Sequence, residues 1–133
     1  MPHRAVISSE LARLFAVLSN PNRVRIVEEL NTRELSVNDL QDLLGVTHAA
    51  VSQQLAVLRT NRIVSERREG RHVYYHLKDP ALAAWVLSGI SFISPDHREM
   101  QEMTNAIEKA KESWSAEDAA QDKEKSKSKA KKS

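Results

Sequence analysis

The feature that most constrains the fold is a change in the period of the apolar residues near position 60. Up to that point apolar side chains recur every three or four residues, as on one face of a helix. Beyond it, Val73, Tyr75 and Leu77 alternate with polar neighbours, which is the period of a half-buried strand. Gly70 lies in the middle of this region, residues 63–77, and allows the positive φ that a tight hairpin needs. The sequence therefore predicts helices followed by one β-hairpin.

Two short helices are expected directly before the hairpin. Residues 37–44 and 48–60 both show helical apolar spacing, and only the Gly45-Val46-Thr47 turn separates them. Ser36 and Asp39 form a capping-box pattern before the first helix, and Thr47 is a plausible N-cap for the second. Two short helices joined by a tight glycine turn are typical of a helix-turn-helix, and a hairpin that follows one is a wing.

Further helix starts are marked by prolines that follow capping residues, at Asn20-Pro21, Asp79-Pro80 and Ser94-Pro95. Together with an earlier apolar stripe they predict helices near residues 11–18 and over 21–31, 80–93 and 95–114. The expected fold class is mainly α (α+β): a winged helix-turn-helix with a β-hairpin wing and C-terminal helices that serve dimerisation.

The charge of the chain is unevenly distributed. Residues 1–114 hold equal numbers of basic and acidic side chains, yet residues 47–78 within them carry a net charge of +4. A neutral domain with one basic segment indicates a docking face for a polyanion. Residues 115–133 are rich in Lys and nearly free of apolar side chains, which predicts a disordered tail whose role the sequence does not define.

Several classes of protein are excluded by what the sequence lacks. It has no cysteine, so disulfides, thiolate metal sites and cysteine nucleophiles cannot form. No apolar run approaches the ~20 residues of a membrane-spanning helix, and no apolar segment of a signal peptide follows Met1. We find no Gly-rich phosphate loop and no paired carboxylates in an apolar setting. We therefore expect a cytoplasmic protein that is neither an enzyme nor attached to a membrane.

Four segments in order carry a resemblance to a known family: residues 18–27 (LSNPNRVRIV), 34–40 (ELSVNDL), 51–59 (VSQQLAVLR) and 67–77 (RREGRHVYYHL). In sequence and spacing they resemble the ArsR/SmtB family of bacterial transcriptional repressors over roughly residues 10–90. The resemblance implies a homodimeric winged helix that binds a double-stranded DNA operator.

The chain departs from the metal-sensing members of that family. Where those members commonly have two cysteines, it has Ser36 and Asn38. Of the ligand positions on the helix after the wing, Asp79 alone fits, because Ala81 stands at the neighbouring one. We therefore predict no cofactor and no metal site of either kind. The sequence leaves open whether His97 joins a metal site and whether a small molecule or ion acts as effector.

The predicted DNA-binding residues lie on the second helix of the motif and on the wing. Gln, Ser and His side chains can pair with base edges, small Ala side chains allow close approach, and Arg side chains suit phosphates or a narrow minor groove. These residues are Thr47, His48, Ala49, Ser52, Gln53, Arg59, Arg67, Arg68, Arg71 and His72. A protein-interaction module built on the same winged helix is the alternative.

The predicted dimer interface combines the first helix with the helices after the wing. Residues 80–93 are apolar nearly all round, and residues 100–114 carry a 3-4-3-4 apolar stripe, which suits helix pairing. The residues are Leu11, Phe15, Trp85, Leu87, Gly89, Met100, Met103, Ile107 and Trp114. On this view residues 1–114 form a DNA-binding and dimerisation domain. The alternative is that the last helix folds back on its own wing domain.

Overall fold

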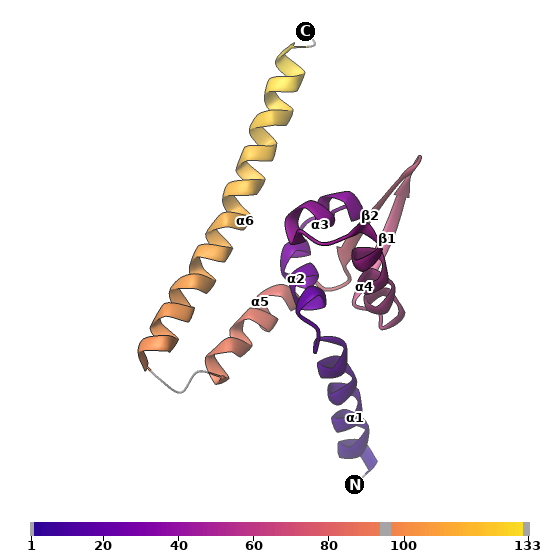
Figure 1. The fold of residues 1–133 in the computed structure, drawn as a ribbon, viewed down its shortest axis with the longest axis vertical. Helices are drawn as coiled ribbons and strands as arrows, with labels where there is room; N and C mark the ends of the chain where they lie inside the picture. The colour runs from indigo at the N-terminus through magenta and orange to yellow at the C-terminus, as the bar shows by residue number, and fades with distance from the viewer. Residues whose placement is uncertain (1, 94–96, 132–133) are drawn as a thin grey trace. The chain divides into compact units, whose positions relative to one another are not determined.

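The structure is a computed structural model that describes residues 2–93 and 97–131. Its contacts divide the chain into two units, Met1–Leu87 and Ser88–Ser133. The first unit contains α1 (Pro2–Val17), α2 (Pro21–Leu30), α3 (Val37–Leu44), α4 (His48–Thr60), β1 (Val64–Glu69), β2 (His72–Leu77) and most of α5 (Leu82–Ser88) (Figure 1). The second contains the 3₁₀ helix η1 (Gly89–Phe92) and α6 (His97–Lys131).

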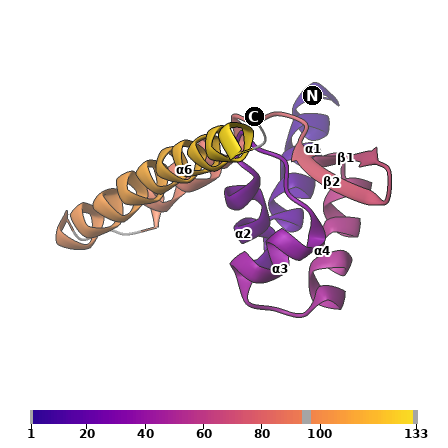
Figure 2. The same cartoon turned by 90° about the horizontal axis from the view of Figure 1, so that it is seen from above.

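The core of the first unit lies where α2, α3, α4 and the wing meet (Figure 2). Its fully buried side chains are all aliphatic and come from each of these elements: Ile26, Val27, Leu30, Leu40, Val51, Leu55, Leu58 and Val64. Burial of this apolar surface at roughly 25 cal/mol per Å² is the main stabilising term for such a domain. The helical spacing in the sequence thus identifies the faces that pack.

The helix boundaries of the motif follow from their caps. Asn20 accepts hydrogen bonds from the backbone N–H of Asn22 and Arg23. Ser36 and Asp39 form the reciprocal capping box, and the Oγ1 of Thr47 accepts from the N–H of Ala50 at 3.1 Å. Gly45 ends α3 with φ 68°, in the left-handed region that glycine tolerates best. The predicted helix-turn-helix is confirmed.

The wing is a two-stranded antiparallel sheet with Val64 opposite Leu77 and Glu69 opposite His72. Gly70 has φ 61°, as the tight turn requires. A backbone bridge joins Leu35 to Tyr75, with N···O distances of 3.0 and 2.8 Å, so the segment before α3 pairs with the wing like a short third strand. The wing is therefore anchored to the helices by backbone hydrogen bonds as well as by its apolar face.

The predicted helix over residues 80–93 is wrong in its extent. Asp79 accepts from the N–H of Ala81 at 3.0 Å and caps a turn, so α5 begins only at Leu82. The α-helix ends at Ser88, and residues from Gly89 onward form η1. Glycine is a poor helix former, which explains a break at this position. The predicted start at Ser94-Pro95 lies outside the described residues.

The backbone after residue 114 also differs from the expectation of a disordered tail, because α6 continues to Lys131. No Gly or Pro interrupts residues 97–131, and Ala, Glu, Gln and Lys are strong helix formers. Asp122 with Lys125 and Glu124 with Lys127 have the i, i+3 spacing of favourable ion pairs. Helix propensity, rather than apolar packing, accounts for the extension.

Candidate nucleic-acid interface

Helix α4 presents a polar, mostly exposed face opposite its buried one. Val51, Leu55 and Leu58 face the core, as predicted. On the other side Thr47, His48, Ala49, Gln53 and Arg59 are exposed, and Ser52 is half-buried. The structure therefore brings all the predicted α4 residues to one surface. Its short side chains and its hydroxyl, amide and imidazole groups are of the kind that reads base edges in a major groove.

The orientation of α4 is fixed by Arg23, whose role sequence reasoning missed. Its Nη1 donates to Oε1 of Gln54 at 2.7 Å, and its Nε donates to the carbonyl of Val17 at 2.6 Å. One guanidinium thus joins the end of α1, the start of α2 and the middle of α4. The signal lay in the Asn20-Pro21 helix entry, which places Arg23 in the first turn of α2.

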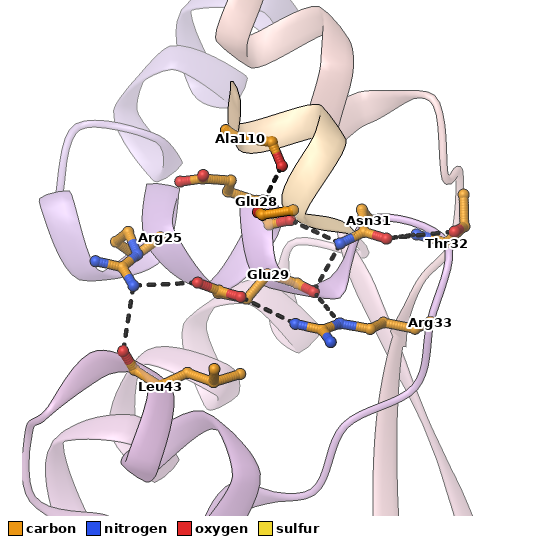
Figure 3. Close-up of polar contacts among 9 residues, drawn as sticks. Arg25, Glu28, Glu29, Asn31, Thr32, Arg33, Leu43 and Ala110 are labelled. Atoms are coloured by element: carbon orange, nitrogen blue, oxygen red, sulfur yellow. Dashed lines mark hydrogen bonds and ion pairs between the residues drawn. The ribbon is translucent and has the colours of Figure 1, made fainter. Parts of the chain in front are cut away.

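A second polar cluster, drawn in Figure 3, holds α3 against α2. Glu29 accepts from Arg25 at 3.1 Å and from Arg33 at 3.0 Å, and the same Arg25 nitrogen donates to the carbonyl of Leu43 at 3.2 Å. The Arg33 Nε also donates to the carbonyl of Glu29 at 2.8 Å. Since Leu43 lies in the last turn of α3, these contacts set the angle at which the turn delivers α4.

The wing tip carries exposed cations. Arg68, Arg71 and His72 lie at or beside the turn, and all three are exposed. Neither Arg68 nor Arg71 forms an ion pair with any carboxylate in the part of the chain that the structure describes. Their charges are therefore available to an external anion such as a phosphate.

Two other predicted phosphate contacts are engaged within the protein. Arg67 lies 2.8 Å from Glu34 and 2.9 Å from Glu69, and its guanidinium lies 5.0 Å from the ring centre of Tyr74. Arg59 forms an ion pair with Glu66 at 3.2 Å. These pairs neutralise both guanidinium charges locally, which the sequence alone did not reveal.

The pairing of Arg67 also affects the ionisation of its partner. The hydrogen bond from Arg67 is the main cause that lowers the pKa of Glu34 below its usual range, with His76, 4.0 Å away, adding a smaller effect. The pKa of Arg67 is raised in turn by its hydrogen bonds to Glu34 and Glu69. Both groups therefore stay charged throughout the physiological pH range, and the pair persists there.

The predicted interface residues lie in both units. On α1, Leu11 is 45% and Phe15 55% exposed, beside the exposed Val6 and Ile7. Trp85 on α5 is 50% exposed. Leu87 is half-buried at the end of α5, and Gly89 begins η1. The remaining residues lie along α6: Met100, Met103, Ile107 and Trp114.

Metal sites and membrane segments were also considered. The described residues contain no group of three or more His, Asp or Glu side chains placed to hold a metal ion. His97 begins α6, but its side chain lies outside the described residues. None of the described helices is both long and apolar enough to cross a bilayer.

Comparison with known proteins decides the family. Residues 20–66, from the cap of α2 into β1, match the model of the bacterial regulatory proteins of the arsR family. The transcriptional repressor SmtB of Mycobacterium tuberculosis is 34% identical over 95 residues, which cover 71% of this chain and 70% of that protein. The chain belongs to the ArsR family. Members of this family are transcriptional regulators rather than enzymes, and the helix-turn-helix and wing described above are their DNA-binding fold.

Two further ArsR relatives are informative. An SmtB homologue of Synechocystis sp., described as a transcriptional repressor, is 43% identical over 72 residues, which is 54% of each chain. The chain therefore spans only about half the length of that relative. The solution structure of Mb0332 from Mycobacterium bovis, described as a homodimeric winged helix-turn-helix DNA-binding domain, is 25% identical with a TM-score of 0.61. The match covers 73% of this chain and 94% of that one.

Proposed function

We propose that the chain is a homodimeric transcriptional repressor that binds a roughly palindromic DNA operator. Helix α4 enters the major groove, and the wing, residues 63–77, lies on the flanking backbone or in the minor groove. The observation that carries the proposal is the exposed face of α4, residues 47–59, next to a wing tip with two unpaired guanidinium groups. Such a protein acts where the chromosome is, so we propose a cytoplasmic location.

The division of labour on this surface follows from side-chain chemistry. Gln53 is exposed at the centre of the α4 face and suits a bidentate contact with adenine, while Ser52 and His48 suit single hydrogen bonds. Arg68 and Arg71 suit phosphates because their charges are not neutralised within the protein. The two pairs Arg59–Glu66 and Arg67–Glu34 serve instead to hold the wing in place.

Dimerisation is supported by the exposed apolar side chains of α1 and α5. Val6, Ile7, Leu11 and Phe15 on α1, and Trp85 on α5, are each at least 45% exposed in the single chain. A cluster of this kind is characteristic of a protein–protein contact. A symmetric dimer would place two α4 helices about 34 Å apart, one turn of the double helix. The homodimeric state described for the Mycobacterium bovis relative supports the same arrangement.

Selection from genomic fragments tests this function. The full chain is mixed with sheared DNA, bound fragments are sequenced, and the enriched sequence is compared with random duplex. We expect one enriched motif with two half-sites about 10 base pairs apart, bound by two protomers. Enrichment of no motif, or equal affinity for selected and random duplex, would contradict the proposal and favour the protein-interaction alternative.

A further inference from the structure

A hollow of about 370 Å³ lies in the first unit where the C-terminal end of α4, the base of the wing and α5 come together. Ile63, Leu82 and Trp85 form an apolar wall, and Arg62, Lys78 and Asp79 form a polar rim. Its volume falls at the lower end of the range of roughly 300–1,000 Å³ for small-molecule sites. The hollow lies on different residues from those assigned to DNA.

The backbone of Arg62 is held in an unfavourable conformation at this rim. Its φ is 61°, in the left-handed region, because α4 ends with bonds from the N–H of Arg62 to the carbonyl of Arg59 and from Ile63 to Leu58, at 3.0 and 2.9 Å. Helices that end in this way usually have glycine at that position. An arginine there costs conformational energy, which favours a role for its side chain.

The charges on the rim favour an anion. Neither Arg62 nor Lys78 forms an ion pair with a carboxylate of the described residues. The Asp79 carboxylate already accepts from the N–H of Ala81 at 3.0 Å. The N–H of Lys78 donates to the carbonyl of Ile63 at 3.0 Å, which keeps the start of β1 and the end of β2 together and both cations on one rim.

We propose that this hollow binds an organic anion with a flat apolar body, its carboxylate against Arg62 and Lys78 and its body against Trp85. A guanidinium can hold a carboxylate through two parallel hydrogen bonds, and an indole ring offers a broad apolar face. The bound molecule would touch both the end of the DNA-reading helix and α5. That position suits an effector, a consequence that rests on the proposed function, whereas the binding itself does not.

The probe for this site is 1-naphthoate, and its control is the uncharged 1-naphthamide. Binding to the full chain is followed through the indole N–H signals in NMR, with Trp85→Phe used to assign them. We expect naphthoate to shift the Trp85 signal and leave the Trp114 signal in place. Naphthamide should bind at least tenfold more weakly. Equal binding of the two compounds, or a shift of Trp114 alone, would overturn the proposal.

The decisive variant is Arg62→Gly, because glycine relieves the left-handed strain and so keeps the chain folded. We expect its Tm to equal or exceed that of the wild type, while affinity for naphthoate falls at least tenfold. Lys109→Gln, which removes a cation elsewhere, should bind naphthoate like the wild type. Wild-type affinity in Arg62→Gly refutes the site. So does a Trp85 signal that moves with protein concentration and ignores naphthoate, because a second copy would then cover the hollow.

The regulatory consequence has its own readout. Naphthoate should change the affinity of the wild type for the selected operator and leave that of Arg62→Gly unchanged. If the chain selects no operator but binds naphthoate as described, the proposed function fails while the anion site stands. An operator affinity that naphthoate does not change in the wild type would refute the effector role.

Discussion

The ion pairs on the wing lead to a prediction about how salt weakens DNA binding. Arg71 and Arg67 lie four residues apart on the same hairpin, and both are arginines that the sequence offers as phosphate contacts. In the structure Arg71 is exposed without an ion pair among the described residues, whereas Arg67 is paired with Glu34 and Glu69. We therefore expect Arg71 to displace a counterion from DNA and Arg67 not to.

The size of the effect follows from counterion release. The logarithm of the affinity falls with the logarithm of the salt concentration with a slope of about −0.9 for each phosphate contact. A dimer loses two such contacts in Arg71→Gln, so the slope should become shallower by about 1.8. Between 50 and 200 mM salt, the affinity of this variant relative to wild type should then rise by roughly 12-fold.

The assay is fluorescence anisotropy of the selected operator duplex at several salt concentrations. The matched control is the double variant Glu34→Gln with Arg67→Gln, which removes a paired cation and anion and leaves the net charge unchanged. Its slope should equal that of the wild type. A control slope as shallow as that of Arg71→Gln would show that Arg67 contacts phosphate, and the assignment of its guanidinium to the wing would be wrong.

Three further outcomes are expected. Ser36→Ala removes one half of the capping box and should cost about 1 kcal/mol, a fall in Tm of roughly 4–8 °C in thermal unfolding; an unchanged Tm would refute the role of the cap. Phe15→Glu should give a folded monomer in sedimentation, since its ring is 55% exposed in the single chain, and a dimer would reject the α1 surface. Because Arg67 lowers the pKa of Glu34, the stability that their pair adds is present above the usual carboxyl pKa and is lost as the pH falls below it. Wild type should therefore exceed Glu34→Gln in Tm at pH 7 and match it near pH 3, and a constant difference would contradict the pairing.

The sequence was sufficient wherever structure is decided locally. The capping box of Ser36 and Asp39, the Thr47 cap and the left-handed Gly45 each act within a few residues, and they gave the bounds of α3 and α4. The buried face of α4 likewise follows from spacing alone. The exposed α4 residues that form the candidate interface are the complement of that face and were found in the same way.

The contacts that were missed join residues far apart in the chain. Arg67 and Glu34 are 33 positions apart and Arg23 and Gln54 are 31 apart, so no periodic pattern connects them. The end of α5 and the length of α6 were misjudged for another reason. At Gly89 and beyond residue 114, intrinsic helix propensity decides the backbone, whereas the apolar pattern was the basis of the prediction.

The central claim is that the exposed face of α4 reads DNA sequence, and Gln53 tests it most directly. Affinities of wild type and Gln53→Ala are measured at one salt concentration on the selected operator and on random duplex. We predict a loss of about 1–3 kcal/mol on the operator, a relaxed preference at one base position, and unchanged affinity for random duplex. Equal affinity of the two proteins for the operator would contradict the placement of α4 in the groove.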